Sequence, residues 1–139
     1  KVHSPIVTPG EADAVVGLEK LEALRFAHYL NIETGTVLVN DHELVPGSVP
    51  NAESIYPRET IDFLKSKGMR VVALPASQTA RDLGDARMAN VVMLGALSTL
   101  LPIEQEVWEK TLKLRIPAKY LDGNLKAFES GYDAMQKAI

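Results

Sequence analysis

The sequence predicts an α/β fold with a mainly parallel sheet. Three short runs of apolar, largely β-branched residues lie along the chain, and a helical or long crossover segment joins each run to the next. Parallel strands need such crossovers, because a tight turn joins antiparallel strands. With 139 residues, 46% apolar and 24% charged, the composition suits one globular domain. We therefore expect a single domain over residues 1–139.

The first predicted unit is a strand, a helix and a second strand. Residues 13–18 form a short apolar run after Pro9-Gly10, which indicates a buried strand. Residues 19–30 change to a helical period, with apolar side chains recurring at intervals of three and four. Residues 36–40 are again apolar and predict a second strand. This order is a βαβ unit with a right-handed crossover.

The middle of the chain combines an irregular segment with a third helix and strand. Residues 41–56 are polar and carry two prolines, which predicts an irregular excursion, with an edge strand left open as an alternative. Pro57 suits the first position of a helix, and Gly68 suits its left-handed C-terminal cap. Residues 69–75 predict a third buried strand.

The second half is predicted to be helical. Ser77 is expected to cap a short helix that ends near Gly84. A longer helix follows over residues 87–101, and two more over 104–114 and 124–138.

The predicted helix over residues 87–101 is apolar nearly all round. Such a helix is buried on every side, and three strands with their own helices can hardly enclose it. We therefore expect a partner subunit, or further chain, to cover it. In isolation the chain is then expected to self-associate as a homodimer.

Composition excludes several classes of function. Fifteen basic and eighteen acidic residues give a net charge of −3 without clustering of either sign, so no nucleic-acid surface is predicted. No apolar run approaches the roughly 20 residues that span a bilayer, and no leader precedes Lys1, so we expect a soluble, cytoplasmic protein. The sequence has no cysteine, which excludes disulfides, cysteine-bound iron–sulfur clusters and thiol nucleophiles from these residues.

The usual motifs for nucleotides and metals are missing. The glycines are too far apart for a Gly-x-Gly phosphate loop or a nucleophile elbow. His3, His28 and His42 lie on separate predicted elements, so no metal site is expected. No residue is assigned a catalytic role.

Four residues are candidates for cofactor binding. Asn40 and Asp41 follow the second predicted strand, and Glu19 follows the first, where open α/β sheets form a crevice for ligands. For Asp41 the alternative is a solvated loop, and for Glu19 an acidic residue that favours the start of the next helix. Asn90 stands on the most apolar helix and must have a partner, either a loop backbone or a ligand or subunit.

Three segments resemble a known family. These are ANVVMLGAL at residues 89–97 with Leu101-Pro102-Ile103, NLKAFESGY at residues 124–132, and His3-Ser4-Pro5 with Glu11-Ala12-Asp13. Together they resemble the gamma subunit or domain of the 2-oxoacid:ferredoxin oxidoreductases. Leu18-Glu19 and residues 21–30 most resemble the beta subunit of indolepyruvate:ferredoxin oxidoreductase.

The resemblance implies a Rossmann-like three-layer fold whose carboxy-terminal part is helical. The amino-terminal strand and glycine-rich turn of the family are missing, so residues 1–139 look like the larger carboxy-terminal part of a gamma-type domain. The family uses thiamine diphosphate, coenzyme A and iron–sulfur clusters, but this chain has no Gly-Asp-Gly thiamine motif and no cysteine. The resemblance therefore implies that this chain alone binds no cofactor.

The implied role is that of a subunit in a complex that oxidatively decarboxylates a 2-oxoacid to an acyl-coenzyme A. The implied partner is a larger subunit that carries thiamine diphosphate and iron–sulfur clusters, with ferredoxin acting through the complex. Indolepyruvate or another aryl pyruvate is the expected substrate, and pyruvate, 2-oxoisovalerate and 2-oxoglutarate are alternatives. An alternative of another class is a stand-alone Rossmann-like module that binds a nucleotide or acyl-coenzyme A.

Overall fold

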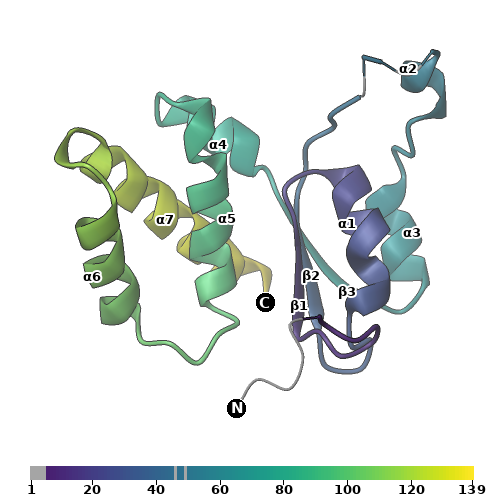
Figure 1. The fold of residues 1–139 in the computed structure, drawn as a ribbon, viewed down its shortest axis with the longest axis horizontal. Coiled ribbons are helices and arrows are strands. Elements are labelled where there is room, and N and C mark those ends of the chain that lie inside the picture. Colours follow the sequence, from purple (N-terminus) through teal and green to yellow (C-terminus); the bar gives the residue numbers. More distant parts are fainter. Residues whose placement is uncertain (1–5, 46, 49) are drawn as a thin grey trace. The chain divides into compact units, whose positions relative to one another are not determined.

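The computed structural model describes residues 6–45, 47, 48 and 50–139, which form two compact units, Lys1–Ala73 and Leu74–Ile139 (Figure 1). Along the first unit and into the start of the second lie β1 (Ala14–Gly17), α1 (Lys20–Phe26), the 3-10 helix η1 (Ala27–Tyr29), β2 (Thr36–Asn40), α2 (Ala52–Ile55), α3 (Thr60–Ser66) and β3 (Arg70–Leu74). The second unit continues with α4 (Ala76–Asp82), the 3-10 helix η2 (Ala86–Met88), α5 (Ala89–Ser98), α6 (Gln105–Arg115) and α7 (Ala118–Ala138). The interpretation of residues 1–139 as a single domain stays a prediction.

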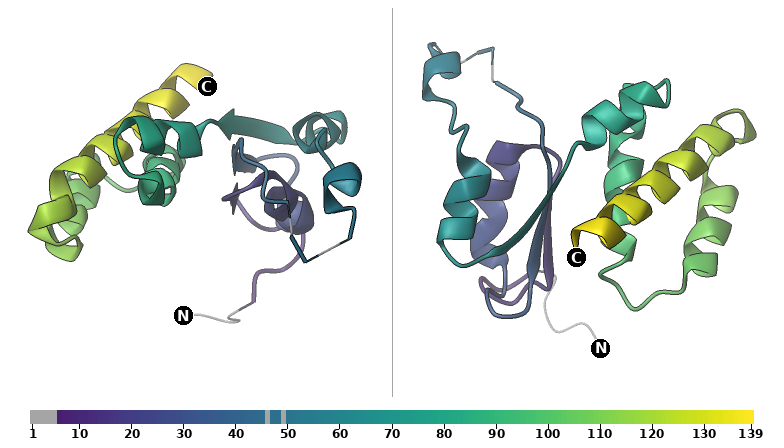
Figure 2. Two further views of the ribbon diagram at one scale, coloured as in Figure 1. Left: turned by 90° about the horizontal axis from the view of Figure 1, so that it is seen from above. Right: turned by 180° about the vertical axis from the view of Figure 1, so that it is seen from behind.

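A three-stranded parallel sheet is the centre of the first unit, with the strands in the order β1-β2-β3. β1 and β2 pair from Ala14↔Thr36 to Gly17↔Val39. Helices α1 and α3 lie side by side on one face of this sheet (Figures 1 and 2). The core under them consists of Val15, Ala23, Ala27, Leu30, Val37, Val39 and Leu64. Alternate residues of β1 and β2 supply its strand side, as the two-residue period of a strand requires.

The strand predictions and the α/β class are confirmed. β1, β2 and β3 lie within residues 13–18, 36–40 and 69–75, and all three are parallel. The predicted helix over residues 19–30 is divided into α1 and η1. In the described part of residues 41–56 there is no strand, and α2 forms one short helical turn.

Two predicted helix starts are wrong. Pro57 is not the first residue of α3, because the helix begins at Thr60, whose hydroxyl donates to the Pro57 carbonyl at 2.5 Å. Ser77 does not cap α4 but lies inside it, and Pro75 occupies the cap position. There the Pro75 carbonyl accepts the first helical hydrogen bonds, from the backbone N–H groups of residues 78 and 79. The predicted C-terminal cap is confirmed, since Gly68 has a φ of +84°.

The helices of the second unit differ at their ends from the sequence prediction. The segment predicted as one helix over residues 87–101 starts as η2 and continues as α5, which ends at Ser98. The last helix starts at Ala118 rather than at residue 124. Gly123 lies inside this helix, beside the Met88 side chain.

Close packing of α5 against α7 forms the core of the second unit. A Cβ added to Gly95 of α5 would overlap the Phe128 carbonyl, because the two would lie much closer than van der Waals contact. A Cβ added to Gly131 of α7 would meet the Val92 carbonyl of α5 in the same way. Each helix therefore presents a glycine to the backbone of the other, which lets the two axes approach closely.

The expectation that a partner must cover α5 is wrong. Every apolar side chain of α5 is buried or half-buried in this chain, because α4, η2 and α7 of the same unit pack around it. The exposed large apolar side chains of the second unit lie elsewhere, mainly on and beside α6. No helix in the part of the chain that the structure describes is long and apolar enough to cross a membrane.

Candidate functional site

The carboxyl ends of β1 and β2 bring three of the four candidate residues together. The parallel register pairs Gly17 with Val39, so the chain leaves both strands at the same edge of the sheet. Glu19 follows β1, Asn40 ends β2, and Asp41 comes next. This edge is the position at which open α/β sheets bind ligands. The three residues therefore lie at one edge of the sheet, and a ligand crevice at this edge stays a prediction.

Glu19 is the N-cap of α1 and has an extended backbone. Its two carboxylate oxygens accept hydrogen bonds from the backbone N–H groups of Leu21 and Glu22 at 2.9 and 2.7 Å. The Tyr56 hydroxyl donates a third hydrogen bond to Glu19 Oε2 at 2.5 Å. The residue is only 8% exposed. Glu19 thus holds the start of α1 and the chain before α3 together, and its oxygens are already engaged.

Tyr56 is buried beside this carboxylate, at 7% exposure. Burial, followed by the hydrogen bond to Glu19 and the negative charge there, raises the pKa of Tyr56 to about 12. The tyrosine is therefore a neutral donor at physiological pH. It has no feature of an activated base.

Asn40 has a structural partner. Its side-chain amide donates to the Leu18 carbonyl at 3.0 Å, which ties the end of β2 to the residue that follows β1. The residue is 3% exposed. The Leu18 carbonyl lies beyond the paired part of β1. Buried polar groups are normally hydrogen-bonded, and the Asn40 amide supplies this bond.

Asp41 belongs to a chain of ion pairs. Lys20 Nζ lies 2.8 Å from Asp41 and 3.2 Å from Glu43. Arg58 then joins Glu43, at 2.9 Å, to Glu53, at 2.8 Å. The hydrogen bond to Asp41 is the main cause of a raised Lys20 pKa, and desolvation opposes it in part. This network fastens the segment after β2 to the start of α1.

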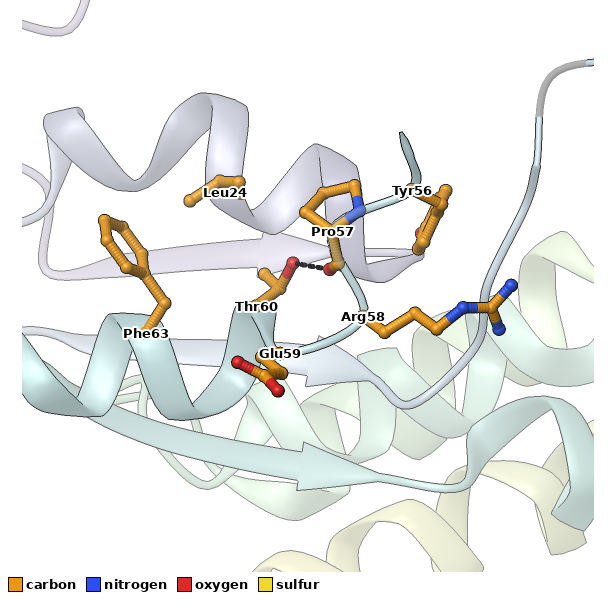
Figure 3. Close-up of a pocket in the computed structure, with 7 residues that line it drawn as sticks. All are labelled: Leu24, Tyr56, Pro57, Arg58, Glu59, Thr60 and Phe63. Atoms are coloured by element: carbon orange, nitrogen blue, oxygen red, sulfur yellow. Dashed lines mark hydrogen bonds between the residues drawn. The ribbon is translucent and has the colours of Figure 1, made fainter. Parts of the chain in front are cut away.

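A hollow of about 560 Å³ lies beside this network, between α1 and the start of α3 (Figure 3). Its lining consists of Leu24, Tyr56, Pro57, Arg58, Glu59, Thr60 and Phe63. Figure 3 shows Leu24 and Phe63 together at one end, while Arg58 extends away from them. The walls are mainly apolar, and the Arg58 guanidinium is held by Glu43 and Glu53. The hollow could take an apolar group, but its one cation is already paired.

The sequence did not point to Lys20, Tyr56 or Arg58. The triplet Tyr56-Pro57-Arg58, an aromatic and a basic residue at the end of a polar segment, is the signal that could have drawn attention to Tyr56 and Arg58. It could not show their partners, because Glu19 and Tyr56 are 37 positions apart.

Asn90 belongs to the second unit. It is exposed at the start of α5, so the argument that it is a buried amide in need of a partner is wrong. It helps to line a hollow of about 390 Å³, with Arg87, Tyr120 and Asn124 among its neighbours. Hydrogen bonds from Arg87 lower the pKa of Asp85 at the same hollow to about 2. Arg87 is therefore engaged by a carboxylate of its own chain.

Metal ligands are not grouped in the described part of the chain. No three His, Cys, Asp or Glu residues there are arranged to hold a metal ion. His28 Nδ1 lies 3.0 Å from the Arg25 carbonyl, and His42 is half-buried in the segment after β2. His3, and with it the resemblance at His3-Ser4-Pro5, lies outside the described residues.

Comparison with known proteins gives the family. A model of the family described as pyruvate ferredoxin/flavodoxin oxidoreductase matches residues 1–134. Indolepyruvate oxidoreductase subunit IorB of Archaeoglobus fulgidus is 35% identical over 136 residues, which cover 95% of this chain and 67% of that protein. IorB of Thermococcus kodakarensis is 31% identical over 145 residues, covering 99% and 70%.

A solved structure agrees with the sequence matches. The gamma subunit of the keto/oxoacid ferredoxin oxidoreductase of Geobacter sulfurreducens has a TM-score of 0.68 and 26% identity, over 95% of this chain and 69% of that one. The family match over residues 1–134 includes both units of the structure. This chain therefore belongs to the pyruvate ferredoxin/flavodoxin oxidoreductase family.

Proposed function

We propose that this chain is a subunit of a 2-oxoacid:ferredoxin oxidoreductase complex and is inactive on its own. The observation that carries the proposal is the family match through residues 1–134, supported by the fold of a gamma subunit. The reaction class is 2-oxoacid + coenzyme A + 2 oxidised ferredoxin → acyl-coenzyme A + CO₂ + 2 reduced ferredoxin + H⁺. The thioester carbon of the product is the former keto carbon, and the two electrons released on decarboxylation go to ferredoxin.

The described residues do not fit the cofactors that this chemistry needs. Iron–sulfur clusters are held by cysteine thiolates, and the sequence has none. The buried candidates at the sheet edge are engaged by their own chain: Glu19 by three donors and Asn40 by the Leu18 carbonyl. We therefore assign thiamine diphosphate, the clusters and the electron transfer to a larger partner subunit, and we derive no catalytic step on this chain.

For the substrate we propose indolepyruvate or another aryl pyruvate. Support comes from the two IorB relatives and from the resemblance of Leu18-Glu19 and residues 21–30 to the indolepyruvate enzyme. Pyruvate, 2-oxoisovalerate and 2-oxoglutarate are the alternatives to be compared. The proposal includes a cytoplasmic location, where the acceptor ferredoxin would be reduced.

Among the four predicted cofactor-binding residues, we propose ligand or subunit contact for Asp41 and Asn90. Both are exposed, whereas Glu19 and Asn40 are buried and act as positioning residues. In the assembled complex, Asn90→Ala should raise the KM for the 2-oxoacid or for coenzyme A at least fivefold. The matched control is Gln136→Ala, which truncates another exposed amide of the second unit.

The test is reconstitution. The chain, its larger partner and the two together are assayed for reduction of ferredoxin with thiamine diphosphate, coenzyme A and each of the four 2-oxoacids. We expect activity only from the mixture, with indolepyruvate giving the highest kcat/KM. If the chain co-purifies stably with a larger subunit but the complex has its highest kcat/KM with another 2-oxoacid, only the substrate assignment would be overturned.

The stand-alone binding module is the competing function, and the hollow beside α3 is the feature that favours it. It predicts that the isolated chain binds a nucleotide or an acyl-coenzyme A with micromolar affinity in calorimetry. Such binding, together with failure to assemble with any larger oxidoreductase subunit, would refute the proposed function.

A further inference from the structure

Helix α6 presents an apolar stripe to solvent on the side that does not pack on its own unit. Leu112 is buried, and the Trp108 ring packs on Phe128 of α7 at 6.0 Å between centroids. On the other side, Val107 is 52% exposed and Leu114 is 81% exposed. Positions seven apart lie on one face of a helix, so these two side chains form a single stripe. Ile103, which is 43% exposed, lies just before this helix.

Charges on this segment are separated along its length. Residues 104–109 include three acidic side chains and no basic one, whereas residues 110–115 include three basic side chains and no acidic one. The macrodipole favours this order within one helix. It also makes the segment self-complementary, because an antiparallel copy would set the acidic half of one helix against the basic half of the other.

The spacing of the residues agrees with such a pair. If a two-fold axis passes midway between Lys110 and Thr111, Val107 of one copy lies opposite Leu114 of the second copy. In antiparallel helices, side chains on the same flank face each other. Glu104 and Arg115 share one flank, and Glu106 and Lys113 share the other, so both acidic residues approach basic residues of the second copy. The same register brings the two Lys110 side chains near each other at the two-fold axis, whereas a parallel arrangement would oppose like charges along the whole segment.

We propose that the exposed face of α6 is a homodimer interface, in which two copies of this chain pair their α6 helices antiparallel about a two-fold axis. A closed two-fold contact of this kind uses the same surface on both copies and stops at a dimer. The apolar stripe is short, so we expect a weak dimer with a Kd on the order of 100 μM.

The experiment is sedimentation equilibrium of the full chain from about 10 μM to 1 mM. Leu114→Asp should leave a monomer throughout, because it puts a carboxylate opposite Val107 of the second copy. Since Leu114 is 81% exposed, circular dichroism of this variant should match that of the wild type.

A charge swap tests the antiparallel geometry itself. Glu104→Arg and Arg115→Glu alone should each weaken the dimer by about tenfold, because each reversal acts twice across a two-fold axis. The double variant Glu104→Arg/Arg115→Glu should restore the wild-type Kd. Neither residue takes part in the Glu109–Lys113 ion pair of α6. Lys126→Glu on the exposed side of α7 is the control and should leave the Kd unchanged.

Three results would overturn the proposal. They are a wild-type chain that stays monomeric at 1 mM, a dimer that persists in Leu114→Asp, and a double variant as weak as the single ones while circular dichroism shows all of them folded. Loss of binding to the larger subunit in Leu114→Asp, with self-association unchanged, would assign the stripe to that subunit instead.

Discussion

At Glu19 three hydrogen-bond donors meet one buried carboxylate. Two of them are backbone groups of α1, and the third is the Tyr56 hydroxyl, which comes from the far end of the excursion after β2. The first two are the ordinary function of an N-cap. The third hydrogen bond ties the start of α1 to a distant segment. Substitutions at Tyr56 should therefore change the free energy of unfolding of the first unit.

Tyr56→Phe should lower the free energy of unfolding by about 1–3 kcal/mol, because it removes one donor from a buried carboxylate. Urea unfolding followed by circular dichroism measures this loss. The matched control is Tyr120→Phe, which removes the hydroxyl of a tyrosine that is 43% exposed and should change stability by less than about 0.5 kcal/mol. Equal losses in the two variants would show that the Glu19 hydrogen bond contributes little.

The same pair predicts a pH dependence. The folded-state pKa of Tyr56 is about 12, above the ordinary value of 10.0. A group whose pKa is raised on folding contributes stability that is complete below the unfolded pKa and is lost as the pH rises through the folded pKa. The difference in unfolding free energy between wild type and Tyr56→Phe should therefore be constant up to about pH 10 and shrink towards pH 12. A difference that stays constant to pH 12 would contradict the assignment.

At the scale of elements, α5 and α7 are held together by reciprocal glycines. Gly95 approaches the Phe128 carbonyl, and Gly131 approaches the Val92 carbonyl. A methyl group at either site must push the helix backbones apart, and backbone atoms cannot give way as a flexible side chain can.

Gly95→Ala and Gly131→Ala should each destabilise the chain by about 2 kcal/mol or more, although alanine is the better helix former by up to about 1 kcal/mol. Thermal and urea unfolding give the values. Gly123→Ala on the same helix is the control, since the added methyl meets only the flexible Met88 side chain at 3.1 Å. It should be neutral or stabilising. A loss for Gly123→Ala as large as for the other two would mean that helix packing is not the cause.

The elements also show how far local pattern predicts structure. The three apolar runs were sufficient to predict the strands, because a strand that is buried on both faces is apolar along its own sequence. The start of α7 was predicted six residues late, since the helix begins at Ala118 and includes Gly123, which lies beside the Met88 side chain. The end of α5 was placed three residues late, because apolar residues continue at Leu100 and Leu101 although the helix stops at Ser98.

For the whole molecule, the chemistry available to the chain follows from its residue types. It has no cysteine, so it cannot hold an iron–sulfur cluster through thiolates. We predict that the purified chain contains no stoichiometric iron, acid-labile sulfide or thiamine diphosphate, and that adding the larger subunit brings all three into the co-purified complex. Colorimetric iron and sulfide analysis and fluorimetric thiamine analysis test this, with the larger subunit alone as the control. One or more iron atoms per isolated chain would contradict it.

Residue types, and their order along the chain, determined the parallel α/β class, the left-handed cap at Gly68, the absence of thiol chemistry and the family. Each of these depends on local composition, on backbone geometry at one residue or on a continuous motif, so no knowledge of distant contacts was needed. The position of Glu19, Asn40 and Asp41 at one edge of the sheet was also predictable, because neighbouring parallel strands end at the same edge.

Only the tertiary structure decided what those side chains do. Glu19 and Asn40 are occupied by Tyr56 and Leu18, residues that are 37 and 22 positions away. The apolar character of residues 87–101 predicted a helix that needs a partner, yet α4 and α7 cover it, and the exposed stripe lies on α6. Hydrophobic periodicity indicates that a face must be buried, but it does not identify the element that covers this face. In the same way, a buried carboxylate needs a hydrogen-bond donor, but the identity of that donor depends on which distant segment packs beside it.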